Sequence, residues 1–348
     1  MKKKVILGLS GGVDSSVAAL LLKKQGYEVI AITFKFTEDF DATDAIEVAK
    51  KIGLEHHILD YRKKFKEKVI DKFISDYKNG ITPNPCILCN RYVKFKFLYD
   101  AMLDFDCDYI ATGHYAKVID GKLYKGEDSN KDQSYFLCEV TKEQLNKILF
   151  PLEGLEKNYV REIARKNDLI NADKKDSTDV CFISSTFKKY MEENVIEKAG
   201  NVIDVRTNEI IGKHTGLSKY TIGQRKGLNI GGTKDRMFVV GKDINKNILY
   251  IATGDDNSYL ISDSCLVEDV NWTYSEKLIN CKAKFRYRQQ ETDVELEHIS
   301  DDKILVKYKD GVKSVTPGQA CVFYDGEVCC GGGIIKEVRK DNKKLWYL

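Results

Sequence analysis

One seven-residue run, Ser-Gly-Gly-Val-Asp-Ser-Ser at 10–16, limits what this chain can fold into more than any other feature. It follows the short apolar stretch 5–9 and precedes the apolar-periodic stretch 17–22, so a strand, a tight turn and a helix are predicted in that order. Two adjacent glycines lack Cβ atoms, which lets successive backbone N–H groups point toward one spot. With the unpaired N–H groups and positive dipole end of the helix, the turn is predicted to cradle a phosphate. An ordinary glycine-rich turn is the competing interpretation.

The composition is that of a globular protein. Of the 348 residues, 43% are hydrophobic and 31% are charged, and at ~150 residues per domain the length suits two or three domains. No run of ~20 apolar residues is present, so we expect a cytoplasmic protein without a membrane partner. Ten cysteines in a reducing compartment argue against a disulfide framework. A net charge of +3 is too small to predict nucleic-acid binding by itself.

The first half of the chain alternates between strand and helix patterns. Further strands are predicted at 29–34, 55–59 and 108–112, and helices at 42–52 and 65–74. Such alternation is typical of a doubly wound parallel sheet, which binds ligands at the carboxyl ends of its strands. The loop at 10–15, Phe34 and Gly113 fall at such ends, so they could share one nucleotide pocket.

Beyond about Glu197 the chain changes to short alternating strands, which are typical of small β barrels or sandwiches. Strands are predicted at 237–240, 248–251, 281–287, 304–308 and 319–324. A break near 254–259 separates two β units. The sequence therefore predicts three domains, at 1–195, 196–257 and 258–348.

A second motif, at 82–97, combines prolines, cysteines, cations and aromatic residues. The prolines on either side of Asn84 are expected to exclude a helix and to hold a rigid turn before Cys86 and Cys89. The cations and aromatic rings that follow suit phosphates and stacked bases. A Cys-x-x-Cys beside Arg91 and Lys94 is also a place where thiolates form easily.

A third motif, at 176–183, brings Cys181 to the start of an apolar stretch. A single cysteine is most often a small buried hydrophobic residue. We apply that interpretation to the seven remaining cysteines: Cys107, Cys138, Cys265, Cys281, Cys321, Cys329 and Cys330.

A basic stretch at 281–288 is predicted to form a strand with one charged face. The period of two puts Lys282, Lys284, Arg286 and Arg288 on that face, with no compensating acid between them. A solvated sheet face and a contact with an RNA backbone are both open interpretations.

The phosphate loop lacks the Gly-Lys-Ser/Thr ending of a Walker A loop and resembles the PP-loop of N-type ATP pyrophosphatases, which cut ATP between the α- and β-phosphates and adenylate a substrate. Over essentially its whole length, the chain also resembles the tRNA-specific 2-thiouridylase family, which replaces the 2-oxygen of the wobble uridine with sulfur. The motifs that carry this second resemblance lie at 8–16, 82–96, 111–116, 131–136, 176–183, 220–228 and 285–289.

The resemblance implies a fold, a set of partners and a set of site residues. The fold is an α/β PP-loop domain with a doubly wound parallel sheet, followed by a central β domain and a C-terminal β-barrel that help to clamp tRNA. Cys89 is implied as the nucleophile and Cys181 as the carrier of a persulfide, with a transient disulfide between them. Contacts with ATP, which acts with Mg²⁺, are implied for Gly8, Leu9, Ser10, Gly11, Gly12, Val13, Asp14, Ser15, Phe34 and Gly113. Contacts with tRNA are implied for Asn84, Pro85, Cys86, His114, Lys131, Asp132, Gln133, Arg286, Tyr287 and Gln319.

The implied tRNAs carry a wobble uridine, of the Lys, Glu and Gln type. The implied sulfur donor is a cysteine desulfurase or a sulfur relay protein. Asp14 is expected to order the loop or the metal, with helix capping as its alternative role.

The chain departs from the family pattern at Cys86, where many members have Asp. Cys86, Cys89 and Cys181 could then bind three irons of a [4Fe–4S] cluster, as an alternative to a persulfide on Cys181. Two other functions stay open at this point. One is an ATP-dependent synthetase that adenylates a substrate and adds an amine, and the other is a non-catalytic tRNA-binding sulfur carrier.

Overall fold

A parallel sheet forms the centre of the N-terminal half in the computed structural model, which describes residues 2–176, 180–228, 236–254, 258–273 and 278–348. Its strand order is β3-β2-β1-β4-β7. These strands are β1 (Lys4–Gly8), β2 (Glu28–Lys35), β3 (Glu55–Asp60), β4 (Tyr109–Ala111) and β7 (Ile148–Leu149). From β1 the chain builds outward to β3 on one side and to β7 on the other. The loops after β1 and β4 therefore open at the point where the strand order reverses, which is where such sheets bind ligands.

Helices cover both faces of this sheet, because β1 is apolar on both sides. Val5 and Leu7 pack with residues of α1 (Val13–Lys24), α2 (Thr43–Ile52) and α9 (Lys157–Lys166). Ile6 points the other way and packs with residues of α6 (Phe95–Asp104). The predicted parallel sheet and its alternating helices are confirmed, and the predicted stop of the 42–52 helix is Gly53 in a left-handed conformation.

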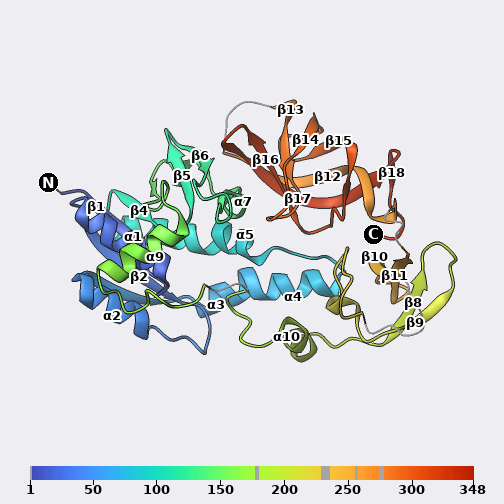
Figure 1. Cartoon of the computed structure of the whole chain (residues 1–348), viewed down its shortest axis with the longest axis horizontal. Helices are drawn as coiled ribbons and strands as arrows, with labels where there is room; N and C mark the ends of the chain where they lie inside the picture. Colours follow the sequence, from blue (N-terminus) through green and yellow to red (C-terminus); the bar gives the residue numbers. More distant parts are fainter. Residues whose placement is uncertain (1, 177–179, 229–235, 255–257, 274–277) are drawn as a thin grey trace.

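Two long helical segments lead away from the sheet toward the β domains (Figure 1). The first consists of α3 (Arg62–Phe65), the π-helical turn η1 (Lys66–Ile70) and α4 (Asp71–Lys78). The second consists of α5 (Pro85–Cys89), the π-helical turn η2 (Asn90–Lys94) and α6. The expectation that the two prolines exclude a helix is therefore wrong after Asn84. Pro85 occupies the first helical position, where its missing N–H costs nothing, and Asn84 caps the helix by accepting from the Cys86 N–H at 3.2 Å.

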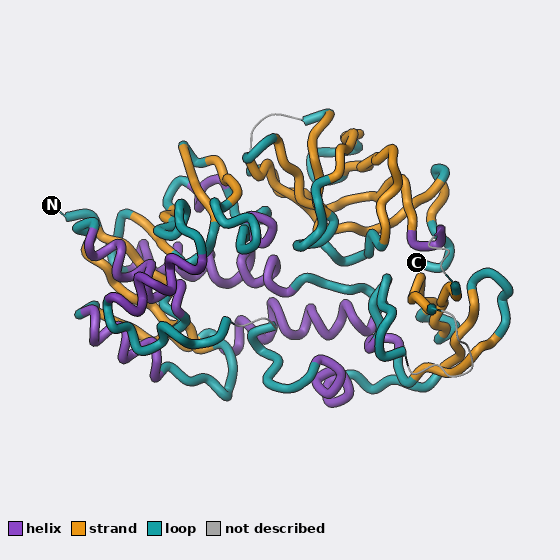
Figure 2. The backbone as a smooth tube through the Cα atoms, viewed as in Figure 1, coloured by secondary structure: helices purple, strands orange, loops and turns teal. Residues whose placement is uncertain are grey.

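The second half is built from strands, as predicted (Figure 2). A four-stranded sheet has the order β10-β11-β8-β9, from β8 (Gly200–Asp204), β9 (Ile210–His214), β10 (Met237–Asp243) and β11 (Ile248–Thr253). The remaining strands form a barrel, which closes because β12 pairs with both β15 and β17. Its strands are β12 (Ile261–Trp272), β13 (Asn280–Lys284), β14 (Thr292–His298), β15 (Ile304–Lys313), β16 (Ala320–Asp325) and β17 (Val328–Lys340).

A hairpin from the N-terminal half extends the barrel sheet. It is formed by β5 (Ala116–Ile119) and β6 (Lys122–Lys125), and β6 pairs with β17. Tyr135 and Leu123 share one buried cluster with Val322 and Tyr324 of the barrel. The sequence did not predict this shared core, which joins the barrel firmly to the PP-loop half.

The remaining elements are short. They are α7 (Ser134–Leu137), α8 (Lys142–Leu145), α10 (Phe187–Asn194), the 3-10 turns η3 (Leu217–Lys219) and η4 (Ser258–Leu260), and β18 (Lys343–Lys344). Within the described residues, no helix has the length and apolar character that crossing a membrane requires.

Candidate functional site

The loop between β1 and α1 has a backbone that only glycine suits at one position. Gly11 has a φ of +74°, and a Cβ there would lie 3.0 Å from the Ala45 nitrogen and from the Asp44 Cβ. Gly12 has an ordinary φ of −84°, and a Cβ there would lie 3.4 Å from the Ser10 Oγ. The tight turn therefore depends on Gly11, whereas a Cβ at Gly12 would make only an ordinary contact with the Ser10 Oγ.

Hydroxyl groups and one amide hold this loop in shape. The hydroxyls of Ser15 and Ser16 donate to the Gly12 carbonyl at 3.0 and 2.9 Å. The buried Asn171 donates to the Gly11 carbonyl and to the Ser16 Oγ, both at 2.8 Å. Two N–H groups of the loop are also bonded within it, since the Ser10 N–H donates to the Ser15 Oγ at 3.2 Å and the Gly12 N–H to the Ser10 Oγ at 3.3 Å. Asn171 was missed by the sequence reasoning, since nothing local links it to a loop about 160 residues away.

The end of strand β4 lies directly against this loop. A Cβ at Gly113, after β4, would come within 2.6 Å of the Asp14 carbonyl carbon and the Ser15 nitrogen. Only glycine allows that approach. Phe34, near the end of the neighbouring β2, packs with Phe36 and Tyr61 at ring-centroid distances of 5.4 and 5.5 Å. The structure thus brings Gly113 to residues 8–15 as predicted, with Phe34 on the adjacent strand.

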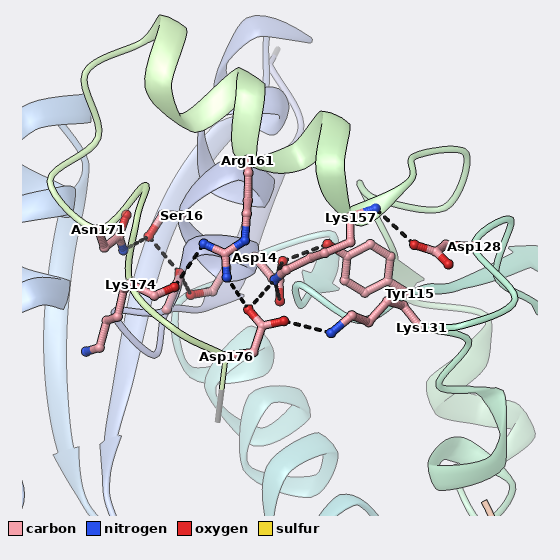
Figure 3. A network of polar contacts seen from close by, with 12 residues as sticks. Asp14, Ser16, Tyr115, Asp128, Lys131, Lys157, Arg161, Asn171, Lys174 and Asp176 are labelled. Atoms are coloured by element: carbon pink, nitrogen blue, oxygen red, sulfur yellow. Dashed lines mark hydrogen bonds and ion pairs between the residues drawn. The ribbon is translucent and has the colours of Figure 1, made fainter. Parts of the chain in front are cut away.

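An ionic network connects the phosphate loop to the start of α9 (Figure 3). The Lys157 ammonium donates to both carboxylate oxygens of Asp14, at 2.6 and 2.8 Å, and the Tyr115 hydroxyl donates to one of them at 2.7 Å. Lys157 also lies 2.9 Å from Asp176, which accepts from Lys131 at 2.7 Å and from Arg161 at 2.6 Å. Burial raises the pKa of Asp176, but hydrogen bonds from Lys131 and Lys157 outweigh it and lower the pKa to about 2.

Sequence reasoning identified Asp14 and Lys131 as site residues but missed Lys157, Tyr115 and Arg161. Asp176 was noted only as the first residue of the third motif. The remaining part of that motif before Cys181 includes 177–179, which lie outside the described residues.

The cysteines of the second and third motifs lie near one another beside an apolar cluster. Cys86 is exposed, and Cys89, one helical turn later, is buried with Phe65, Val93 and Phe97. Phe182 packs against the same cluster, and the exposed Cys181 lies near enough to Cys86 and Cys89 to contribute to the raised pKa of both thiols. The described structure thus assembles the three predicted cysteines from two distant segments.

The expectation that thiolates form easily here is wrong. Burial raises the pKa of Cys89 to about 12, and the neighbouring Lys94 offsets this only in part. Loss of water around the thiol groups also raises the pKa of Cys86 and of Cys181. Arg91 does not help, because it pairs at 3.0 Å with the buried Glu139.

The three thiols do not fit a metal cluster in this arrangement. Among the residues that the structure describes, no three Cys, His, Asp or Glu side chains lie close enough to hold a metal ion. A ligand set of Cys86, Cys89 and Cys181 is therefore not formed.

Most side chains implied in tRNA contacts have partners inside the protein. Asp132 is buried and accepts from the Ser134 N–H and the Gly126 N–H, both at 3.0 Å. The side chain of Gln133 accepts from the Tyr115 N–H at 3.0 Å, and that of Gln319 donates to the Thr82 carbonyl at 2.7 Å.

His114 and Tyr287 are likewise held in place. His114 lies 2.7 Å from the Thr112 hydroxyl and 3.4 Å from the Lys94 ammonium. Burial and then Lys94 lower the pKa of His114 well below its usual range, so the ring is neutral. Tyr287 packs on Phe136 with ring centroids 4.3 Å apart.

The basic stretch at 281–288 was predicted to be a strand with an uncompensated charged face, and the structure differs on both points. The strand β13 ends at Lys284, which lies 3.6 Å from Glu291 and 3.8 Å from Asp132, and Lys282 lies 4.0 Å from Asp293. Arg286 is turned inward and donates to the Ile222 carbonyl at 2.9 Å and to the Thr316 hydroxyl at 2.6 Å. Both lysines of the face therefore have acidic neighbours, and Arg288 is the exposed arginine of the stretch.

Comparisons with known proteins cover the whole chain. Residues 3–185 match a domain family described as the tRNA methyl transferase HUP domain, residues 188–253 the tRNA methyl transferase PRC-barrel domain, and residues 262–335 the aminomethyltransferase beta-barrel domain. A curated protein of Mesoplasma florum named tRNA-specific 2-thiouridylase MnmA is 46% identical over 370 residues, covering 96% of this chain and 99% of that protein. The protein of the same name in Bacillus subtilis is 45% identical over 364 residues, covering 99% of this chain and 98% of that protein.

Proposed function

This chain belongs to the tRNA-specific 2-thiouridylase family, and from that membership we propose that it is the enzyme that uses ATP to replace the 2-oxygen of a tRNA wobble uridine with sulfur. The observation that carries the proposal is the presence of a phosphate loop together with two cysteines that are distant in sequence, Cys89 and Cys181, and lie near one another in the structure. The matched domain families refer to methyl transfer in their descriptions. Methyl transfer from an activated donor requires neither ATP cleavage nor a pair of thiols, so the site supports thiolation.

In the first step, the uridine O2 attacks the α-phosphorus of ATP. The bond to the bridging oxygen breaks, and pyrophosphate leaves with the electron pair. The N–H groups after Gly11 are oriented for the phosphates before ATP binds, since Asn171, Ser15 and Ser16 already hold the loop carbonyls. The phosphates would be bound together with Mg²⁺, which would neutralise part of their charge. Asp14 already faces a cation, Lys157, and we assign it to ordering the loop rather than to direct metal ligation.

In the second step, a persulfide on Cys181 supplies the sulfur. Its outer sulfur attacks C2 and displaces AMP, which leaves the uridine joined to Cys181 through a disulfide. The Cys89 thiolate then attacks the Cys181 Sγ, releasing 2-thiouridine and forming a Cys89–Cys181 disulfide that an external dithiol reduces. Because burial raises the pKa of Cys89 to about 12, its thiol is protonated at neutral pH and loses that proton to solvent as it attacks Cys181.

The substrates and location follow from the same proposal. We assign tRNAs of the Lys, Glu and Gln type, and a cysteine desulfurase or sulfur relay protein as the donor that loads Cys181. We place the protein in the cytoplasm, where tRNA and ATP are available.

A reconstituted assay tests this function. Purified protein, ATP, a persulfide donor and unmodified tRNA should yield AMP and 2-thiouridine in equal amounts, measured by chromatography and nucleoside mass spectrometry. AMP without 2-thiouridine, in the presence of an amine donor, would support the amidating synthetase. No AMP despite tRNA binding would support the sulfur carrier.

A further inference from the structure

The phosphate loop carries no cation of its own. No Lys or Arg occurs in residues 8–16, whereas a Walker A loop carries a lysine that serves the β- and γ-phosphates. An enzyme that releases pyrophosphate needs positive charge there, because negative charge accumulates on the leaving group.

Lys157 supplies a cation at the rim of this loop from a distant element. It is the first residue of α9, and its N–H donates to the Asp128 carboxylate at 3.0 Å, which fixes where the side chain starts. The side chain is only 8% exposed, and its ammonium lies on Asp14, in the first turn of α1. The N–H groups of that same turn form the predicted phosphate cradle.

The Lys157 ammonium can leave its carboxylate partners and bind a phosphate instead, because both carboxylates have other hydrogen-bond donors. If its ammonium turns to a ligand, Asp14 keeps the hydrogen bond from the Tyr115 hydroxyl. Asp176 keeps its bonds from Lys131 and Arg161 (Figure 3). Neither carboxylate is then left buried without a partner, which is the costly outcome when an ion pair is broken. Both carboxylates also face solvent in part, with 33% and 29% of the side chains of Asp14 and Asp176 exposed.

We propose that Lys157 binds the β- and γ-phosphates of ATP and stabilises the pyrophosphate as it leaves, with Asp14 and Asp176 holding the ammonium in position beforehand. This inference rests on the proposed function, since it assigns a residue to the adenylation step. The ammonium donates hydrogen bonds to phosphate oxygens and keeps its proton, while the bond between the α-phosphorus and the bridging oxygen breaks.

The first test uses the wild-type protein and an ATP derivative with an acyl group on its terminal phosphate. An amine beside that phosphate attacks the acyl carbon, forming an amide and releasing ATP. We expect mass spectrometry to find the acyl group on Lys157, with labelling suppressed by excess ATP and not by AMP. Lys166 lies on the same helix with 71% of its side chain exposed, and serves as the control for non-specific acylation.

The outcomes separate this inference from the function on which it rests. Labelling that ATP suppresses at other lysines, with Lys157 unmodified, would overturn the assignment of Lys157 and leave ATP use intact. Absence of ATP binding altogether would overturn both.

The second test compares ligands in Lys157→Gln, which removes the charge and keeps a polar side chain, with a thermal unfolding curve to check that the fold is kept. Loss of one charge-assisted contact should weaken binding of ATP and of pyrophosphate by about 10- to 100-fold, and binding of AMP by less than about 3-fold. Lys166→Gln should change none of the three. Equal losses for ATP and AMP, or no loss for pyrophosphate, would mean that Lys157 has a structural role only.

Discussion

The phosphate loop and the thiol site are neighbours in this molecule but are prepared for chemistry in opposite ways. Around the loop, ions and hydrogen bonds fix several groups that shape the site, among them the carbonyl of Gly11 and the carboxylate of Asp14. Around the thiols, aromatic and aliphatic side chains raise the pKa of Cys89 to about 12. The first site is organised before its ligand arrives, and the second keeps its nucleophile protonated.

The difference suggests a division of labour between the two half-reactions. Adenylation needs a fixed geometry around an anion, which polar groups supply. Sulfur transfer needs a thiol that does not react with a persulfide before the activated uridine is present. Changes at the loop should therefore stop both half-reactions, and changes at the thiols should stop only the second.

The largest effect is expected for Gly11→Val. The positive φ and the contact with Ala45 exclude a side chain, so the turn must rearrange and the N–H groups lose their alignment. AMP formation should fall by on the order of 10³-fold, measured by chromatography of the reaction products. Gly154→Ala, where a Cβ would meet no atom within 4 Å, is the control. Undiminished AMP formation in Gly11→Val would show that the loop is not part of the ATP site.

Cys89→Ser and Cys181→Ser should abolish 2-thiouridine formation and leave AMP formation within about 3-fold of the wild type, since neither residue holds the phosphates. Nucleoside mass spectrometry and AMP release are measured on the same samples. Cys107→Ser, at a half-buried cysteine outside this site, is the matched control. Multiple-turnover thiolation by either serine variant would contradict the persulfide route.

The ion network should make stability depend on acid pH through Asp176. Its pKa is lowered from 3.8 to about 2, so its contribution is present above pH 3.8 and is lost as the pH falls toward 2. The shift corresponds to at most about 2 kcal/mol, reduced by partial solvent exposure of the carboxyl. Urea unfolding of the wild type and Asp176→Asn, at pH 6 and near pH 2.5, measures the difference. The two proteins should converge at the lower pH, and a constant gap would contradict the assignment.

A smaller effect is expected for Arg288→Ala on tRNA binding. Because Arg288 is exposed and Arg286 is bonded to Ile222 and Thr316, we expect Arg288 rather than Arg286 to reach a phosphate. Removing one phosphate contact should weaken binding several-fold and lower the salt slope by about 1, with ATP binding unchanged. Lys307→Ala, which removes an ion pair with Glu297, is the control. An unchanged salt slope would favour the other interpretation, in which the stretch is a solvated face that does not contact RNA.

The smallest effect is expected for Cys86→Ala. On the persulfide route Cys86 carries no sulfur, so thiolation should stay within about 3-fold of the wild type. Iron and sulfide analysis after anaerobic purification is the companion measurement. A loss as large as that of Cys89→Ser, together with bound iron, would instead support a cluster and would show that the thiols rearrange to bind it.

Much of the fold was predictable because the signals are local. The strand before Gly8, the glycine turn and the helix after it depend on apolar periodicity and on backbone freedom within about 20 residues. The alternating pattern then predicted a parallel sheet, and with it the side of the sheet where residues 8–15 and Gly113 would meet. The start of α5 was misjudged because a proline excludes a helix from its interior but suits the first position.

What the sequence by itself determined is which chemical groups are present and which short segments present them: a glycine turn for phosphates, a Cys-x-x-Cys, and a third cysteine far along the chain. Only the tertiary structure decided the partners and surroundings of those groups. Lys157 meets Asp14 across 143 residues, the hairpin of β5 and β6 joins the barrel, and burial rather than Arg91 or Lys94 dominates the pKa of Cys89. The physical reason is that charge pairing and desolvation depend on which distant surfaces come together, and no local pattern of residues encodes that.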